Sequence, residues 1–304
     1  MSHIRSEDAD RVDSSVDELL EQGRRSGARV HISHLKIVLG SDTAQARGIL
    51  QRMANERSQG RSVTADVYPY TASFTGLSIL FPDWARPPND YEAVVASRRA
   101  ELARYLRGRV EGRNGPEATL FGSGPWAGRT LAEAAQEMDR PFEEVLVELG
   151  PGGARAAYFV MDPEVMTTFL LDPWVAVASD GSPTMAHPRG YGTFPRFLRE
   201  QVVEASRLSV EEGIRKATSL PASILGVDDP RRVEVTRGLI AEGWAADLVA
   251  FRLEEVQDRA DFQDPHQLAR GMEEIWVNGE LTWSGGAPLD RTGAGRAIRA
   301  GGGS

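Results

Sequence analysis

Apolar strands alternate with amphipathic helices along this chain, and that alternation limits the folds it can adopt. Residues 28–33 (ARVHIS) and 62–70 (SVTADVYPY) have the composition of strands, and a helix is expected between them at 43–56. A wholly apolar run at 174–178 (WVAVA) ends abruptly in SDG at 179–181, as a buried parallel strand would. A strand–helix–strand order that repeats at about 30 residues predicts βα units and an α/β fold with a parallel sheet.

A long interruption separates the first strands from those that follow. Residues 80–151 contain helical segments punctuated by Pro and Gly, and so long a stretch between strands predicts an inserted helical subdomain or lid. The flanking residues 1–79 and 152–225 would then form the α/β part. From 226 to 304 the sequence alternates and turns like antiparallel β-structure, and it ends in a low-complexity GGGS tail at 301–304.

The composition argues against several classes of function. The 44 acidic residues outnumber the 35 basic ones, and the resulting net charge of −9 argues against a nucleic-acid-binding surface. There is no cysteine, so the chain contains neither a disulfide nor a thiolate metal ligand. Its apolar runs are far shorter than the roughly 18 residues of a membrane span, and the opening MSHIR does not look like a signal peptide. We therefore expect a soluble, cytoplasmic protein with neither a membrane nor a nucleic acid as partner.

Reactive side chains end three of the predicted strands. His34 follows the first strand, Asp66 and Tyr68 end the second, and Asp180 ends the apolar run, while His3 lies just before the first helix. In α/β barrels the active site collects at the carboxyl ends of the strands, so these side chains are candidates for one site. Two histidines and an aspartate suit a hydrolytic metal centre, which needs neutral imidazole ligands and a carboxylate that takes a proton from water.

Each of these residues also has a structural interpretation. His34 could be a hydrogen-bonded structural histidine, and Asp180 could open a turn or cap a helix. The YPY sequence could be the aromatic edge of the core. Among the other histidines, His31 is expected in the core or on the surface, His187 lies in a loop without an assigned role, and His266 is expected on the surface.

Short motifs in a fixed order give the chain a family resemblance. They are SHIRSE (2–7), SHLK (33–36), DVYPYTAS (66–73), SDG (179–181), HPRGYGTFPR (187–196), TSLPA (218–222) and RGLIAEGWAADLV (237–249). In their order and spacing the sequence resembles the amidohydrolase superfamily, and most closely its N-acyl-D-amino-acid deacylases. The resemblance extends over nearly the whole chain, and HPRGYGTFPR is its most specific piece.

The resemblance implies a fold and a metal centre. The family has a metal-dependent (β/α)8 barrel with a small β-sandwich, and its site holds one or two zinc ions. The family pattern places metal-binding histidines at His3 and His34 of this chain. It places the general acid/base, which is sometimes also a metal ligand, at Asp180.

The resemblance also implies a substrate and the residues that bind it. The substrate would be an N-acyl-D-amino acid, hydrolysed to a carboxylate and a D-amino acid. By the family pattern its free carboxylate is bound by Lys36, Tyr68 and Arg189. Arginine and lysine suit that task, because a guanidinium can bind a carboxylate through two hydrogen bonds and an ammonium adds a point charge.

Two family features are missing from this sequence. The family opens with a His-x-His motif on strand one and a bridging Cys on strand two, and neither is present. We therefore expect only strands five to eight of the barrel and part of the sandwich, the C-terminal portion of a deacylase. Such a portion could be inactive alone, and it could associate with a missing N-terminal half or with itself. Two alternatives stay open: an amidohydrolase acting on a cyclic imide, hydantoin or dipeptide, and a catalytically dead fragment that serves as an assembly module.

Overall fold

A three-stranded parallel sheet forms the base of the molecule in a computed structural model that describes residues 1–290 and 293–299. Strands β1 (Val30–Ile32), β2 (Val63–Val67) and β6 (Val175–Val177) lie in the order β1-β2-β6, all parallel. Ser2 extends the sheet by a parallel bridge to Ile32. Four chain segments therefore run side by side in sequence order, as consecutive βα units would. The GGGS tail lies outside the described residues.

Amphipathic helices cover this sheet, as the apolar periodicity predicts. They are α1 (Val12–Ser26), α2 (Thr43–Ser58) and α6 (Pro163–Leu171), and their apolar faces share one core with the strands. Local sequence fixes where they begin and end. Asp42 caps the first turn of α2 by accepting the Ala44 N–H, and Gly27 ends α1 in a left-handed conformation with a φ of 70°, which glycine adopts without a Cβ clash.

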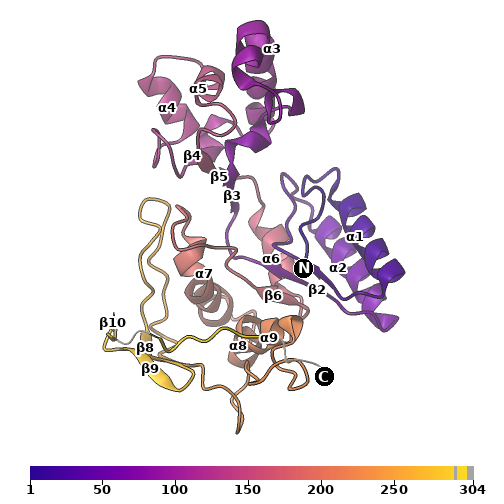
Figure 1. Cartoon of the computed structure of the whole chain (residues 1–304), viewed down its shortest axis with the longest axis vertical. Coiled ribbons are helices and arrows are strands. Elements are labelled where there is room, and N and C mark those ends of the chain that lie inside the picture. The colour runs from indigo at the N-terminus through magenta and orange to yellow at the C-terminus, as the bar shows by residue number, and fades with distance from the viewer. Residues whose placement is uncertain (291–292, 300–304) are drawn as a thin grey trace.

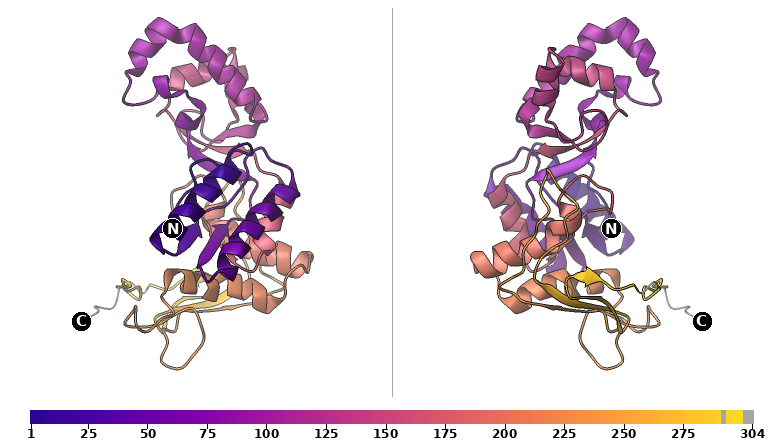
Figure 2. Two further views of the ribbon diagram at one scale, coloured as in Figure 1. Left: turned by 90° about the vertical axis from the view of Figure 1, so that its right-hand side faces the viewer. Right: turned by 90° about the vertical axis from the view of Figure 1, so that its left-hand side faces the viewer.

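A second unit projects from the base above the parallel strands (Figures 1 and 2). Its antiparallel sheet has the order β3-β5-β4, and it carries three α-helices and three short 3-10 helices. Its elements are β3 (Ala72–Gly76), η1 (Leu77–Leu80), η2 (Asp83–Ala85), α3 (Tyr91–Glu111), η3 (Pro116–Ala118), β4 (Thr119–Phe121), α4 (Leu131–Glu137), α5 (Phe142–Leu149) and β5 (Arg155–Phe159). We call residues 72–159 the upper unit. Its helices pack on one apolar core of their own.

The upper unit corrects the boundaries of the predicted helical insertion. The prediction confined it to 80–151 and assigned both flanks to the α/β base. The structure instead pairs 72–76 with 155–159, so residues 72–79 and 152–159 belong to the upper unit, which is not purely helical. The physical reason is non-local: strand β5 finds its partners on β3 and β4 rather than on the parallel sheet, and its own sequence does not specify which sheet it joins.

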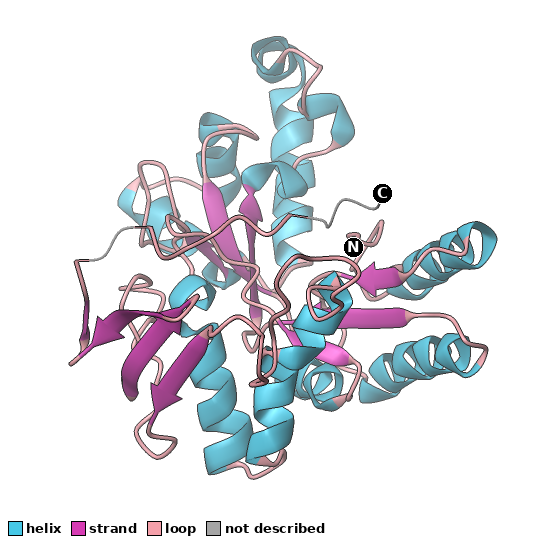
Figure 3. Cartoon of the chain, turned by 60° about the horizontal axis from the view of Figure 1, so that its bottom comes forward, coloured by secondary structure: helices cyan, strands magenta, loops and turns pink. Residues whose placement is uncertain are grey.

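The remaining chain forms a helical layer and a separate sheet (Figure 3). The helices are α7 (Arg189–Phe197), the π-helix η4 (Leu198–Glu204), α8 (Val210–Ala217) and α9 (Ser219–Leu225). The sheet is antiparallel in the order β10-β9-β8-β7, as the alternation from 226 onward predicts. Its strands are β7 (Leu248–Phe251), β8 (Met272–Val277), β9 (Glu280–Ser284) and β10 (Ala287–Pro288). None of the helices within the described residues is both long and apolar enough to span a membrane.

Candidate metal and substrate site

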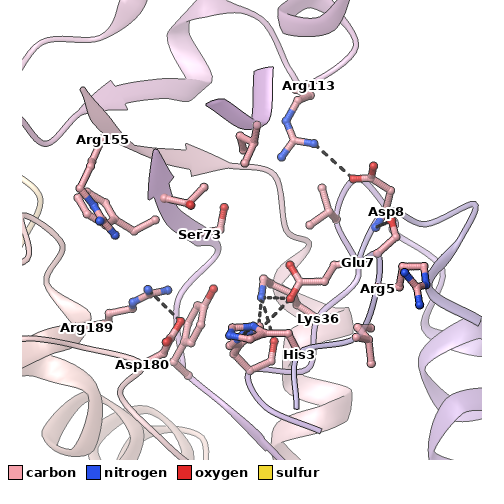
Figure 4. Close-up of a pocket in the computed structure, with 18 of the residues that line it drawn as sticks. His3, Arg5, Glu7, Asp8, Lys36, Ser73, Arg113, Arg155, Asp180 and Arg189 are labelled. Carbon is pink, nitrogen blue, oxygen red and sulfur yellow. Dashed lines mark hydrogen bonds and ion pairs between the residues drawn. The ribbon is translucent and has the colours of Figure 1, made fainter. Parts of the chain in front are cut away.

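A cavity of about 520 Å³ lies between the parallel strands and the upper unit. The residues that follow β1, β2 and β6 form its lower wall, and residues of the upper unit form the opposite wall (Figure 4). All six side chains singled out in the sequence line this one cavity: His3, His34, Lys36, Tyr68, Asp180 and Arg189. They come together because the carboxyl ends of neighbouring parallel strands meet at one edge of a sheet.

Two histidines converge at the lower wall. His3 Nδ1 and His34 Nε2 face each other in direct contact, and the two ring centroids lie 4.2 Å apart. His34 follows β1 with a φ of 41°, and Asp180 follows β6 with a φ of 45°. A positive φ is uncommon for residues other than glycine and concentrates at functional sites, where the surrounding structure must hold it in place.

Asp66 holds the backbone of His34 in this conformation. Its Oδ1 accepts the His34 N–H at 2.7 Å, and its Oδ2 accepts a hydrogen bond from His31 Nε2 at 2.6 Å. His31 is fixed in turn by Thr64, whose hydroxyl donates to Nδ1 over 2.8 Å. Thr64, His31 and Asp66 therefore form a chain of hydrogen bonds that leads from β1 and β2 to the backbone of His34. The sequence flagged Asp66 only as a strand-end residue and left His31 without a function, because their contact depends on the register of the two strands.

A carboxylate and an ammonium contact the ring of His34 from the other side. Glu7 Oε1 lies 2.9 Å from His34 Nδ1, and Lys36 Nζ donates to Glu7 over 2.6 Å. Burial alone would raise the pKa of Glu7, but its hydrogen bond with His34 and the charge of Lys36 lower it below its ordinary value. Burial lowers the pKa of Lys36, and Glu7 opposes that shift. Glu7 lies in the SHIRSE motif, yet the sequence assigned it no role.

Arg189, Asp180 and Tyr68 form a second group in the cavity. The Arg189 guanidinium forms an ion pair with Asp180, with Nη2 2.9 Å from Oδ2, and it lies 4.5 Å from the centroid of the Tyr68 ring. The Tyr68 hydroxyl is buried without a hydrogen-bond partner, and burial raises its pKa. Buried hydroxyl groups normally have a hydrogen-bond partner, and the Tyr68 hydroxyl has none. A bound anion could accept a hydrogen bond from this hydroxyl and from the neighbouring Arg189 guanidinium.

His187 fixes the position of Arg189 from behind. The fully buried ring accepts the Arg189 N–H at Nδ1 over 3.0 Å, so its proton is on Nε2, which donates to the Ala72 carbonyl at 3.0 Å. Burial, helped by the charge of Arg189, lowers the pKa of His187 to about 3, so the ring is neutral. His187 thereby ties the start of α7 to β3 of the upper unit.

The two histidine nitrogens could supply part of a metal-binding site, but not all of its ligands. Neutral imidazoles suit zinc, and His3 and His34 direct their nitrogens at one point. Asp180 is not grouped with them, since its carboxylate is paired with Arg189. Across the parts of the chain that the structure describes, no three His, Cys, Asp or Glu side chains are placed to hold a metal ion. The predicted set of His3, His34 and Asp180 is therefore assembled only in its two histidines.

Comparisons with known proteins show what this chain is similar to. Residues 148–283 match the amidohydrolase family model. The chain is 34% identical over 297 residues to the N-acyl-D-aspartate deacylase of Alcaligenes xylosoxydans xylosoxydans, covering 97% of this chain and 51% of that protein. It is 32% identical over 294 residues to the N-acyl-D-glutamate deacylase of the same organism, covering 96% and 53%.

A solved structure agrees with the sequence comparisons. The N-acyl-D-glutamate deacylase of Bordetella bronchiseptica, complexed with zinc and a phosphonate inhibitor, superposes with a TM-score of 0.78 at 28% identity. The match covers 98% of this chain and 55% of that structure, so the chain spans about half the length of the relatives it matches. The chain is thus similar to the N-acyl-D-aspartate and N-acyl-D-glutamate deacylases over about half of their length.

Proposed function

We propose that this chain carries part of the active site of a zinc-dependent N-acyl-D-amino-acid deacylase, which hydrolyses a linear amide to a carboxylate and a D-amino acid. One observation carries the proposal: all six side chains that match the family's motifs line a single cavity. The names of the relatives support the choice of an acyl amino acid and its D configuration. In this proposal the four parallel segments are strands five to eight of a (β/α)8 barrel, and the sheet after residue 226 is part of the β-sandwich.

His3 and His34 are the proposed metal ligands. Bound there, zinc would polarise the scissile carbonyl and lower the pKa of a water molecule. Glu7 Oε1, 2.9 Å from His34 Nδ1, can accept a hydrogen bond from that nitrogen, and this tautomer leaves Nε2 free as a ligand atom. Because a catalytic zinc site uses three protein ligands, the two histidines need a further ligand, and no third His, Cys, Asp or Glu is grouped with them within the described residues.

Asp180 is the proposed proton carrier. Its side chain is partly exposed and lines the cavity, and the Arg189 guanidinium lies 2.9 Å from its Oδ2. In this proposal the Asp180 carboxylate takes a proton from the attacking water and returns it to the nitrogen of the leaving amine. Both transfers balance within the hydrolysis: water supplies a hydroxyl to the acyl carbon and a proton to the amine.

Arg189, Lys36 and Tyr68 are the proposed carboxylate-binding groups. Arg189 and Lys36 supply positive charge from buried positions, and the unpartnered Tyr68 hydroxyl supplies a donor between them. This set selects an open-chain substrate with a free carboxylate over a cyclic imide or hydantoin. The proposed lid function of the upper unit follows from its place across the cavity, where it would shield the scissile amide from water.

Binding and turnover of the purified chain test the proposal. Calorimetry should show binding of N-acetyl-D-amino acids and markedly weaker binding of their methyl esters, which lack the carboxylate. Turnover assays with and without added zinc should include a hydantoin and a dipeptide. Equal binding of acid and ester, or hydrolysis of the hydantoin or dipeptide in preference to the acyl amino acid, would contradict it. Absence of binding to any of them would favour an assembly module.

A further inference from the structure

The chain segment that precedes α7 contacts both the upper unit and the rest of the chain. Met185 and Ala186 pack against an apolar cluster of the upper unit that includes Phe74 of β3. His266, in the loop between β7 and β8, donates through Nε2 to the Met185 carbonyl over 2.9 Å. The segment leads directly into Arg189, the first residue of α7. Its position therefore determines where the Arg189 backbone lies.

His187 is the residue of this segment whose side chain is completely buried. Its imidazole ring makes edge-to-face contacts with the rings of Tyr70, Phe74 and Phe262, at centroid distances of 5.3, 6.1 and 4.9 Å. These three rings come from the end of β2, from the upper unit and from the loop between β7 and β8. Close packing from three sides leaves the imidazole little freedom to rotate.

The two ring nitrogens of His187 connect different units. Nδ1 accepts the Arg189 N–H over 3.0 Å, and Nε2 donates to the Ala72 carbonyl over 3.0 Å. Ala72 is the first residue of β3, where the upper unit begins. Because an imidazole ring is rigid, it fixes the separation between the Ala72 carbonyl and the Arg189 amide. Moving the upper unit away from α7 must either shift Arg189 or break a buried hydrogen bond, which is costly.

The aim of the Arg189 guanidinium depends on this backbone position. The side chain is 3% exposed, and its Nε is buried without a hydrogen-bond partner. Figure 4 shows the guanidinium directed toward Asp180, to which it is paired. Since no hydrogen bond holds Nε, a displacement of the Arg189 backbone is passed on to the guanidinium. A binding group must be held within about 0.5 Å of its productive position, so even a small displacement matters.

We propose that His187 is a positioning residue that couples the upper unit to Arg189, so that the upper unit and the guanidinium move together. The inference rests on the proposed function, which assigns Arg189 to the substrate carboxylate and the upper unit to the lid. It adds that the two are not independent. An N-acyl amino acid bound by Arg189 favours one position of the upper unit, and by thermodynamic linkage that position favours binding.

Two substitutions separate the two hydrogen bonds of His187. In His187→Asn the amide oxygen takes the place of Nδ1 and can accept the Arg189 N–H in an Asx-type turn, but the side chain is too short to reach Ala72. In His187→Gln the amide nitrogen takes the place of Nε2 and can donate to Ala72, but no acceptor replaces Nδ1. The first variant removes the link to the upper unit, and the second releases the Arg189 amide.

Calorimetry and amide hydrogen exchange on the full 304-residue chain test the coupling, with N-acetyl-D-aspartate as the ligand. Exchange is followed in β4, because none of its residues lines the cavity and its rate reports on the upper unit without a ligand contact. In the wild type the ligand should slow this exchange. His187→Asn should abolish the response. His187→Gln should weaken binding by up to about tenfold, as for one lost hydrogen bond, and more than His187→Asn does.

Phe262→Leu is the matched control. It changes the packing around the His187 ring and Phe159 but removes no hydrogen bond, so both the affinity and the exchange response should be retained. Thermal unfolding of each variant shows whether it is folded. If His187→Asn does not fold, His187→Gln still decides, because unchanged affinity in that variant would overturn the positioning role.

The outcomes separate this inference from the proposed function. A response in His187→Asn equal to that of the wild type, or no response in a wild type that binds the ligand, would overturn the coupling and leave the proposed function standing. Loss of the response in Phe262→Leu as well would assign the coupling to packing and overturn the role of the His187 hydrogen bonds. Absence of ligand binding by the wild type would overturn both proposals.

Discussion

Asp66 shows how a side chain outside the cavity lining can control the candidate site. It accepts the His34 N–H and pairs with His31, so it connects the sheet to one of the two converging imidazoles. Second-sphere partners of this kind orient a ligand, and their loss costs 10–100-fold in metal affinity. Asp66 therefore acts by positioning His34 rather than by contacting a substrate.

Substituting Asp66 should weaken zinc binding without unfolding the chain. In Asp66→Asn the amide oxygen can still accept the His34 N–H, so we expect a loss of about tenfold in zinc affinity. Asp66→Ala removes both hydrogen bonds and should cost more. Competition titrations with a zinc-sensitive dye measure the affinity, and thermal unfolding of the same samples reports on stability. Unchanged zinc affinity in Asp66→Ala would show that Asp66 has only a structural role.

Arg189→Lys should weaken the binding of N-acyl-D-amino acids. A lysine keeps the charge but not the paired hydrogen bonds of a guanidinium, and Arg189 is almost fully buried. We expect a loss of roughly 2–5 kcal/mol in binding free energy, as for one partner of a buried charge pair. In Asp180→Asn, by contrast, ligand binding should persist, because Asp180 is assigned to proton transfer and not to the substrate carboxylate. Calorimetry on both variants distinguishes the two roles, and equal losses of binding would refute the division between them.

The sequence could predict which residues lie together at the site, but not the hydrogen-bond and ion-pair partners that fix their positions. Strand-end position alone singled out His34, Tyr68 and Asp180, because the geometry of a parallel sheet brings strand ends together. The partners Glu7 and His187 were not predicted as such. Their contacts depend on how loops and strands distant in sequence approach one another, which local pattern does not encode.

At the scale of elements, the helices were predicted closely and strand pairing was not. Helix α2 begins at the predicted Thr43 and extends to Ser58, because its cap and its apolar periodicity are both local signals. Strands β3 and β5 instead form an antiparallel pair that redraws the predicted boundaries of 80 and 151. Pairing depends on partners far away in the chain, so a short apolar strand does not reveal which sheet it joins.

His187, which connects β3 with the start of α7, should make the stability of the fold decrease at acidic pH. Folded His187 stays neutral down to about pH 3, whereas its ordinary pKa is 6.5. Between those values the unfolded chain binds a proton that the folded chain does not, so this contribution to stability is lost as the pH falls from 6.5 toward 3. His187→Gln has no such titration, and its amide can still donate to Ala72. The difference in unfolding free energy between wild type and variant should shrink by about 3 kcal/mol from neutral pH to pH 4. Urea titrations across this range measure it, and a constant difference would contradict the expectation.

At the scale of the whole molecule, the two walls of the cavity belong to different units. The base contributes the histidines, Glu7 and Asp180, and the upper unit contributes the arginine-rich wall. Asp8 connects the two units. It belongs to the base segment that follows His3, and its carboxylate pairs with Arg109 and Arg113 of the upper unit. The arrangement separates the proposed metal ligands of the base from the arginines of the upper unit.

The hydrolytic activity expected of the isolated 304-residue chain depends on how many metal ligands it provides. Two converging imidazoles, with no third ligand grouped with them in the described residues, should bind zinc far more weakly than a three-ligand site. We therefore expect negligible hydrolysis of N-acetyl-D-aspartate by the purified chain, even with added zinc, while ligand binding by the cavity persists. Zinc content after dialysis and amine release measured with and without a chelator check this. Robust hydrolysis that the chelator abolishes would show that other residues complete the metal site. His3→Ala and His34→Ala would then show whether the two histidines belong to it.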